Sequence, residues 1–141
     1  MGQVTVGKII LNQFRVDQYI ASGGMSSVFR VWDLKRNVYL AMKVLSTDLA
    51  EDPSMLKRFR REARAMQKLV HPNIVPFYGL YDTEDFYFLL ESFVDGPNLK
   101  DILKQSPNKT LSLQDTLIFI KAICAALGYA HTNGVVHCDI K

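Results

Sequence analysis

The sequence predicts an α+β fold in which a small antiparallel sheet with one helix is followed by further helices. Three stretches early in the chain alternate apolar with polar residues and are rich in Val, Tyr and Phe, which favours strands. The breaks between them are short, as in antiparallel hairpins. Apolar residues recur at helical spacing in the middle and towards the end of the chain. Strands, one helix, strands and then helices, in that order, are typical of an α+β protein.

A lead-in at residues 1–13 precedes three expected strands at residues 14–21, 27–33 and 38–45. Ser22-Gly23-Gly24-Met25-Ser26 separates the first two strands, and Leu34-Lys35-Arg36-Asn37 separates the next two. Gly, Ser and Asn favour turns, so both segments are expected to close hairpins.

A helix is expected to begin at Asp52-Pro53 and to run to about Val70. Asp can cap the free N–H groups of the first turn, and Pro is favoured at the first helical position. His71-Pro72-Asn73 ends the helix. Its apolar stripe consists of Met55, Leu56, Phe59, Ala63, Met66, Leu69 and Val70. Glu62 falls within this stripe, three residues after Phe59 and four before Met66.

Two more strands are expected at residues 75–81 and 86–91, joined by a polar turn at residues 82–85. A turn at Asp95-Gly96-Pro97-Asn98 leads into a short helix near residues 98–105. A longer helix starts at Ser112, with Asp115 in a capping-box-like position, and ends at Asn133-Gly134. A break near residues 92–96 divides the sheet-forming part from the helical part.

Composition excludes several classes of protein. Apolar residues make up 48% and charged residues 22% of the 141 residues, as in an ordinary globular domain. The net charge of +3 is too small to indicate nucleic acid or membrane binding. Cys124 and Cys138 are too few for a disulfide framework and fit a reducing cytosolic setting. We expect no membrane-spanning run and no secretory signal, and therefore a cytoplasmic protein.

Lys43 and Glu62 are the first candidates for a functional pair. Lys43 lies in a strand with apolar flanks, where a lysine either extends to the edge of the sheet or meets an acid. Glu62 lies on the apolar face of its helix, where a carboxylate is costly without a cation. The inward-facing Glu62 therefore favours an ion pair with Lys43 over a lysine at the edge of the sheet. The other face of this helix is basic and is most simply a solvated face, with a docking surface for an acidic partner as the alternative.

Several motifs give the chain a resemblance to the protein kinase family. Val135-Val136-His137-Cys138-Asp139-Ile140-Lys141 resembles the start of the kinase catalytic loop, with Cys138 where the family has Arg. Ala41-Met42-Lys43 resembles the A-x-K motif of the third strand, and Glu62 the helix glutamate that pairs with this lysine. His71-Pro72-Asn73-Ile74-Val75 and the run from Ala126 to His131 also match. The resemblance covers residues 14–141 and is closest to bacterial members of the eukaryotic-type Ser/Thr kinases.

The resemblance implies a small lobe at residues 14–91, with a five-stranded antiparallel sheet and one helix. Residues 92–141 would then be the hinge and the start of a truncated large lobe, after the lead-in at 1–13. Lys43 is expected to contact nucleotide phosphates and Glu62 to hold it. Asp139 would orient and deprotonate the substrate hydroxyl, and Lys141 would steady the transferred phosphate. Cys138 cannot make the bidentate phosphate contact of an arginine.

The glycine-rich loop is the least typical motif. The remaining nucleotide-binding positions implied by the resemblance are Ile20, Ala21, Ser22, Gly23, Gly24, Met25, Ser26, Val28 and Ala41. Glycines in this loop let backbone N–H groups approach phosphates, and Ala21 and Ser26 replace two of them. The segment is therefore either an ordinary hairpin turn or an ATP lid with a weakened phosphate grip.

The hinge can be aligned with the family in two ways. Aligning on Val94-Asp95-Gly96 places Glu91 at the gatekeeper position, which is normally apolar, and Ser92 at the first hinge position. Aligning Glu91 as the hinge acid implies one extra residue. We therefore assign no adenine contact here.

The resemblance implies ATP as cofactor. It implies Mg²⁺ only in the complete domain, because the residues that bind Mg²⁺ would lie beyond residue 141. No metal ligand is assigned, and the fragment alone is expected to be inactive. Expected partners are ATP and a protein substrate with Ser or Thr, without nucleic acid. Association through the exposed helix at 112–133 is a further expectation. Two functions stay open: a Ser/Thr protein kinase domain, or a non-catalytic kinase-like module that binds nucleotide or a partner protein.

Overall fold

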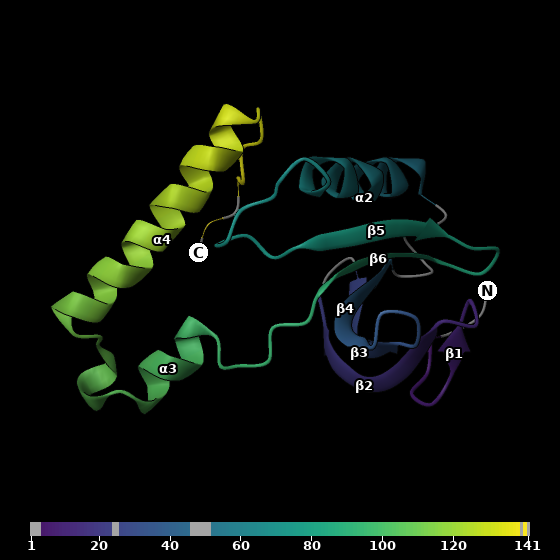
Figure 1. The fold of residues 1–141 in the computed structure, drawn as a ribbon, viewed down its shortest axis with the longest axis horizontal. Helices are drawn as coiled ribbons and strands as arrows, with labels where there is room; N and C mark the ends of the chain where they lie inside the picture. The colour runs from purple at the N-terminus through teal and green to yellow at the C-terminus, as the bar shows by residue number, and fades with distance from the viewer. Residues whose placement is uncertain (1–3, 24–25, 46–51, 139, 141) are drawn as a thin grey trace. The chain divides into compact units, whose positions relative to one another are not determined.

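The computed structural model describes residues 4–23, 26–45, 52–138 and 140 (Figure 1). The chain divides into two compact units. The first comprises Met1–Lys68 and Val75–Phe93, and the second comprises Leu69–Ile74 and Val94–Lys141. Gly24, Met25, Asp139 and Lys141, which the sequence singled out, lie outside the described residues.

The first unit is built on a curled antiparallel sheet of six strands in the order β1-β2-β3-β4-β6-β5 (Figure 1). Its strands are β1 (Ile9–Ile10), β2 (Phe14–Ser22), β3 (Ser26–Asp33), β4 (Val38–Leu45), β5 (Phe77–Asp82) and β6 (Tyr87–Ser92). The α+β prediction is confirmed and the five strands expected after residue 13 are all present, but the sheet has a sixth strand in addition. The sixth strand comes from the predicted lead-in, where Ile10 pairs with Phe14 and is buried. A two-residue strand is too short to show an alternating pattern.

Helix α2 (Pro53–Met66) begins where the sequence predicted. Asp52 accepts a hydrogen bond from the Ser54 amide at 2.8 Å, and Pro53 takes the first helical position. The helix ends at Met66, earlier than the predicted end at Val70. Val70 is 83% exposed, so no burial favours continuing the helix to that residue.

The two faces of the sheet bury different side chains. One face forms the larger core, whose buried members are Ile10, Phe14, Val16, Phe29, Val31, Leu40, Met42, Val44, Phe86, Phe88 and Leu90. The other face packs against α2 through Leu45, Leu89 and Phe59. Because strand side chains alternate between faces, the residues between the larger-core positions of β4 and β6 lie on the α2 face. These residues include Lys43.

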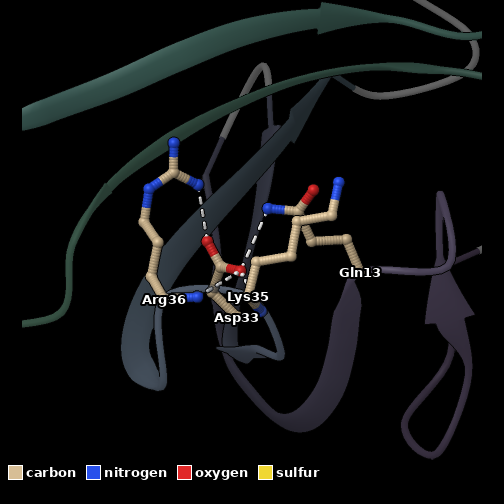
Figure 2. Close-up of polar contacts among 4 residues, drawn as sticks. All are labelled: Gln13, Asp33, Lys35 and Arg36. Carbon is tan, nitrogen blue, oxygen red and sulfur yellow. Dashed lines mark hydrogen bonds and ion pairs between the residues drawn. The ribbon is translucent and has the colours of Figure 1, made fainter.

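Asp33 fixes the hairpin that carries β4 (Figure 2). Its side chain is fully buried at the end of β3. One carboxylate oxygen accepts hydrogen bonds from the Gln13 side chain (3.0 Å) and from the amides of Lys35 (2.9 Å) and Arg36 (3.2 Å). The other accepts from the Arg36 guanidinium at 2.7 Å. Burial by itself would raise the pKa of Asp33, but the hydrogen bonds from Arg36, Gln13 and the two amides outweigh it and lower that pKa.

The second unit contains α3 (Leu99–Gln105), the short 3₁₀ helix η1 (Pro107–Lys109) and α4 (Leu113–Thr132). The predicted start of α4 is confirmed, since the Ser112 hydroxyl accepts from the Asp115 amide at 3.0 Å. Its end is confirmed as well, because Gly134 follows the helix with φ of +72°, which glycine adopts easily.

The segment Leu69–Ile74 is held against α4. The Tyr129 hydroxyl accepts a hydrogen bond from the Val70 amide (3.3 Å), and the Asn73 side chain donates to the Ala122 carbonyl (3.3 Å). The rings of His71 and Tyr129 lie 5.3 Å apart. These contacts, which include the His-Pro-Asn run, lie within the second unit.

Helix α4 is poorly covered. Five of its large apolar side chains are exposed: Leu113, Leu117, Ile118, Ile120 and Ile123. Contrary to our expectation of no such run, its length and hydropathy would allow it to cross a membrane. This is weak evidence for a membrane span, because core helices of soluble proteins have the same length and composition.

Candidate functional site

The Lys43 side chain forms an ion pair with Glu62. Lys43 lies on β4, in register with Val28 of β3 and Leu89 of β6. Its ammonium group donates to a Glu62 carboxylate oxygen at 2.5 Å. The predicted pair is therefore present, and it joins the centre of the sheet to α2. The side chains of Lys43 and Glu62 are 27% and 36% exposed, so water reaches both.

Exposure determines what this pair can do. A partly exposed ion pair adds little to stability, on the order of 1 kcal/mol or less. The larger penalty of roughly 3–5 kcal/mol for removing one partner applies to a dry site, which this is not. An ammonium group has three N–H donors, and one of them points to Glu62. The remaining donors can bind an anion, and Glu62 fixes where they point.

The hairpin between β2 and β3 ends close to Lys43 in register. The Gly23 amide donates to the Ser26 carbonyl at 2.8 Å and closes the turn. Ile20, Ala21, Ser22 and Gly23 are all exposed, whereas Ser26 is buried opposite Leu45. Val28 lies directly opposite Lys43. The strand register thus places Val28 beside the lysine and Ala21, which pairs with Val28, one strand further away.

The fold itself does not require glycine at position 23. A Cβ added to Gly23 would meet no atom closer than the Ser26 carbonyl oxygen at 4.0 Å. A glycine that the fold does not need is consistent with close approach of a ligand to the backbone.

Glu91 lies on the same face of the sheet as Lys43. It is opposite Ala41 on β4, two residue pairs along from Lys43 and Leu89. Leu90, in contrast, points into the larger core. The hinge alignment based on Val94-Asp95-Gly96 makes Glu91 the gatekeeper. In that alignment the gatekeeper therefore lies on the same sheet face as Lys43. Burial raises the pKa of Glu91, Lys43 lowers it and Glu62 raises it further, and the net shift is upward.

The catalytic-loop residues are only partly described. Asp139 and Lys141 lie outside the described residues, so their placement relative to Lys43 stays a prediction. Cys138 is exposed, is not in a disulfide and has a φ of +61°. Among residues 4–23, 26–45, 52–138 and 140, no group of three or more His, Cys, Asp or Glu side chains could hold a metal ion.

The sequence analysis missed the structural role of Asp33 and left open the sheet face on which Glu91 lies. Asp33 was missed because its partners Gln13 and Arg36 come together only through strand pairing. The local signal was an Asp before a four-residue turn, a favoured position for accepting amide hydrogen bonds. The orientation of Glu91 was left open because only the register with β4 decides its face.

A curled antiparallel sheet, a strand lysine paired with a helix glutamate and a hairpin turn beside that lysine define the small lobe of a protein kinase. The comparison with known families agrees, since residues 14–141 match the protein kinase domain. The chain belongs to this family.

Two relatives illustrate the similarity to bacterial proteins. The chain is 35% identical over 136 residues to the serine/threonine-protein kinase PrkC of Bacillus subtilis, covering 96% of this chain and 21% of that protein. It is 34% identical to the serine/threonine-protein kinase PknB of Mycobacterium leprae, covering 92% of this chain and 21% of that protein. The chain therefore spans about a fifth of the length of these relatives.

Solved structures support the fold. The crystal structure of the M. tuberculosis PknI kinase domain superposes with a TM-score of 0.83 at 24% identity, covering 99% of this chain and 55% of that one. At this identity the likeness shows the shared fold alone.

Proposed function

We propose that this chain is the first part of an ATP-dependent Ser/Thr protein kinase domain. The observation that carries the proposal is the ion pair between Lys43 and Glu62, on a strand whose neighbour β3 leads directly from the Gly23 turn. The Ser/Thr preference is supported by the names of the relatives PrkC and PknB and by Lys141 two residues after Asp139.

In this proposal, Glu62 holds the Lys43 ammonium so that its other N–H donors face the nucleotide phosphates. The residues of the hairpin turn cover the phosphates with their backbone amides, and Ala41 borders the base. These N–H donors fit a polyphosphate for two reasons. Glu62 holds the Lys43 ammonium in place, and a ligand can approach the backbone at Gly23.

The catalytic step is assigned to the terminal loop by resemblance. Asp139 would accept the proton of a substrate hydroxyl, and Lys141 would stabilise the transferred phosphate. Mg²⁺ would neutralise charge on the phosphates in the complete domain. We place the protein in the cytoplasm, because its two cysteines are not in a disulfide and its substrate class and ATP are found there.

Nucleotide binding to the 141-residue chain tests this proposal. An ATP analogue with a fluorescent label should bind the wild type, and Lys43→Met should weaken binding at least tenfold through loss of the fixed cation. Lys57→Met, which removes an exposed lysine on the outer face of α2, is the matched control and should bind as the wild type does. Equal affinity of Lys43→Met and Lys57→Met would refute the site.

A non-catalytic module is the second candidate. The observations that favour it are Ala21 and Ser26 in place of loop glycines and the acidic Glu91 near Lys43. In that case the chain would bind nucleotide or a partner protein without transfer. Phosphorylation of a generic Ser/Thr protein substrate by the domain extended past residue 141 would decide for the kinase, and its absence with intact binding would decide for the module.

A further inference from the structure

Lys43 has a second acidic neighbour besides Glu62. Glu91 is the diagonal neighbour of Lys43 across the β4 and β6 pair, since Lys43 lies opposite Leu89 and Glu91 follows two residues later. Diagonal positions on one face of an antiparallel pair are about 7–8 Å apart, within reach of two long side chains. Both residues are on the face covered by α2, which carries Glu62.

The surroundings of Glu91 contain few other charges. Phe77, opposite Glu91 on β5, is apolar. Arg30 of β3 is in register with Ala41, but its guanidinium lies over the rings of Tyr39 (4.7 Å) and Phe93 (5.7 Å). Lys43 from β4 and Glu62 from α2 are therefore the charged groups that act on Glu91 among the described residues, in agreement with the two charge effects on its pKa.

We propose that Glu91 is a positioning residue that competes with Glu62, and with the phosphates of a bound nucleotide, for the ammonium group of Lys43. The part that concerns the nucleotide rests on the proposed function. When Glu91 is ionised, the three side chains carry a net charge of −1, and this disfavours an anion. When Glu91 is protonated their net charge is zero, and Lys43 pairs with Glu62 alone.

The sign of the pH effect follows from this charge balance. Because burial raises the pKa of Glu91, its change in charge falls at a higher pH than for an ordinary glutamate. Nucleotide affinity should decrease as the pH rises through this pKa. An additional charge at this separation, screened as near a protein surface, changes the affinity roughly tenfold.

The first experiment measures binding of the labelled ATP analogue to the 141-residue chain from acidic to mildly basic pH. Glu91→Gln should bind roughly tenfold tighter than the wild type at the basic end and should show a flatter profile. Glu91→Asp retains the charge and should retain the pH dependence. Glu84→Gln, in the exposed turn between β5 and β6, is the control and should follow the wild type. A Glu91→Gln profile equal to the wild type, with Lys43→Met still weakened, would overturn the inference and leave the proposed function intact.

The second experiment needs no nucleotide. Carbon-detected NMR titration follows the carboxyl groups of Glu91 and Glu62 in the wild type and in Lys43→Met. Since Lys43 lowers the pKa of Glu91, removing the ammonium should raise that pKa. An unchanged titration would overturn the inference. A raised pKa without nucleotide binding by any variant would support the shared lysine and refute the proposed function.

Discussion

Replacement of Asp33 should destabilise the unit that carries Lys43. Its carboxylate is fully buried and accepts four hydrogen bonds, three on one oxygen and one on the other. Asp33→Ala removes the acceptor for all four donors, including two backbone amides. Loss of a buried charge-assisted network of this kind costs about 3–5 kcal/mol.

Asp33→Asn separates shape from charge. Its amide oxygen can still accept from Gln13, Lys35 and Arg36, as Oδ1 does now. The amide NH₂ group, however, would face the Arg36 guanidinium, and two hydrogen-bond donors cannot bond to each other. Arg36 is partly exposed and can turn to water, which leaves mainly a buried amide without a partner. We expect a loss of roughly 1–3 kcal/mol for this variant.

Urea unfolding followed by tryptophan fluorescence measures both effects. Trp32 is the single tryptophan of the chain and directly precedes Asp33, so the signal reports on this hairpin. Asp82→Asn is the matched control, because its ion pair with Arg60 (2.9 Å) is exposed and is worth about 1 kcal/mol or less. Equal midpoints for Asp33→Ala and Asp82→Asn would refute the reasoning.

The pH dependence provides an independent check. The pKa of Asp33 is lower in the folded than in the unfolded chain, so the unfolded chain binds more protons between the two values. The stability from Asp33 is therefore complete above the unfolded pKa and is lost as the pH falls through the folded pKa. The difference in free energy of unfolding between wild type and Asp33→Asn should shrink in acid. A difference that grows in acid would contradict the assigned charge state.

Three further predictions concern the binding loop and α4. Gly23→Ala should leave the free energy of unfolding within about 1 kcal/mol, because the added methyl meets nothing closer than the Ser26 carbonyl oxygen at 4.0 Å, but it should weaken nucleotide binding; unchanged affinity would identify an ordinary hairpin turn. The double variant Ala21→Gly, Ser26→Gly should bind the ATP analogue more tightly than the wild type in a fluorescence titration, because backbone amides can then approach the phosphates; equal affinity would count against a phosphate lid. Leu117→Lys should reduce self-association in analytical ultracentrifugation by placing charge on the exposed face of α4, and an unchanged sedimentation profile would show that this face does not associate.

Most of the first unit could be predicted because its signals are local. The alternation of residues 38–45 and the Asp52-Pro53 start gave elements that the structure reproduces. The pair of Lys43 and Glu62 was reached from two separate patterns, a lysine in an apolar strand and a glutamate on an apolar helix face. The predictions that failed also have physical reasons. The short strand Ile9–Ile10 exists only because β2 offers it hydrogen-bond partners, and Val70 fits the helical stripe without being buried.

The sequence by itself determined the order of strands and helices from Phe14 onward and the caps of α2 and α4. These depend on neighbours within a few positions along the chain, where periodicity and capping chemistry act. Only the tertiary structure decided that Asp33 is buried under the β3–β4 hairpin and that Glu91 shares a sheet face with Lys43. Both depend on strand register, and a shift of one residue would turn each side chain to the opposite face of the sheet.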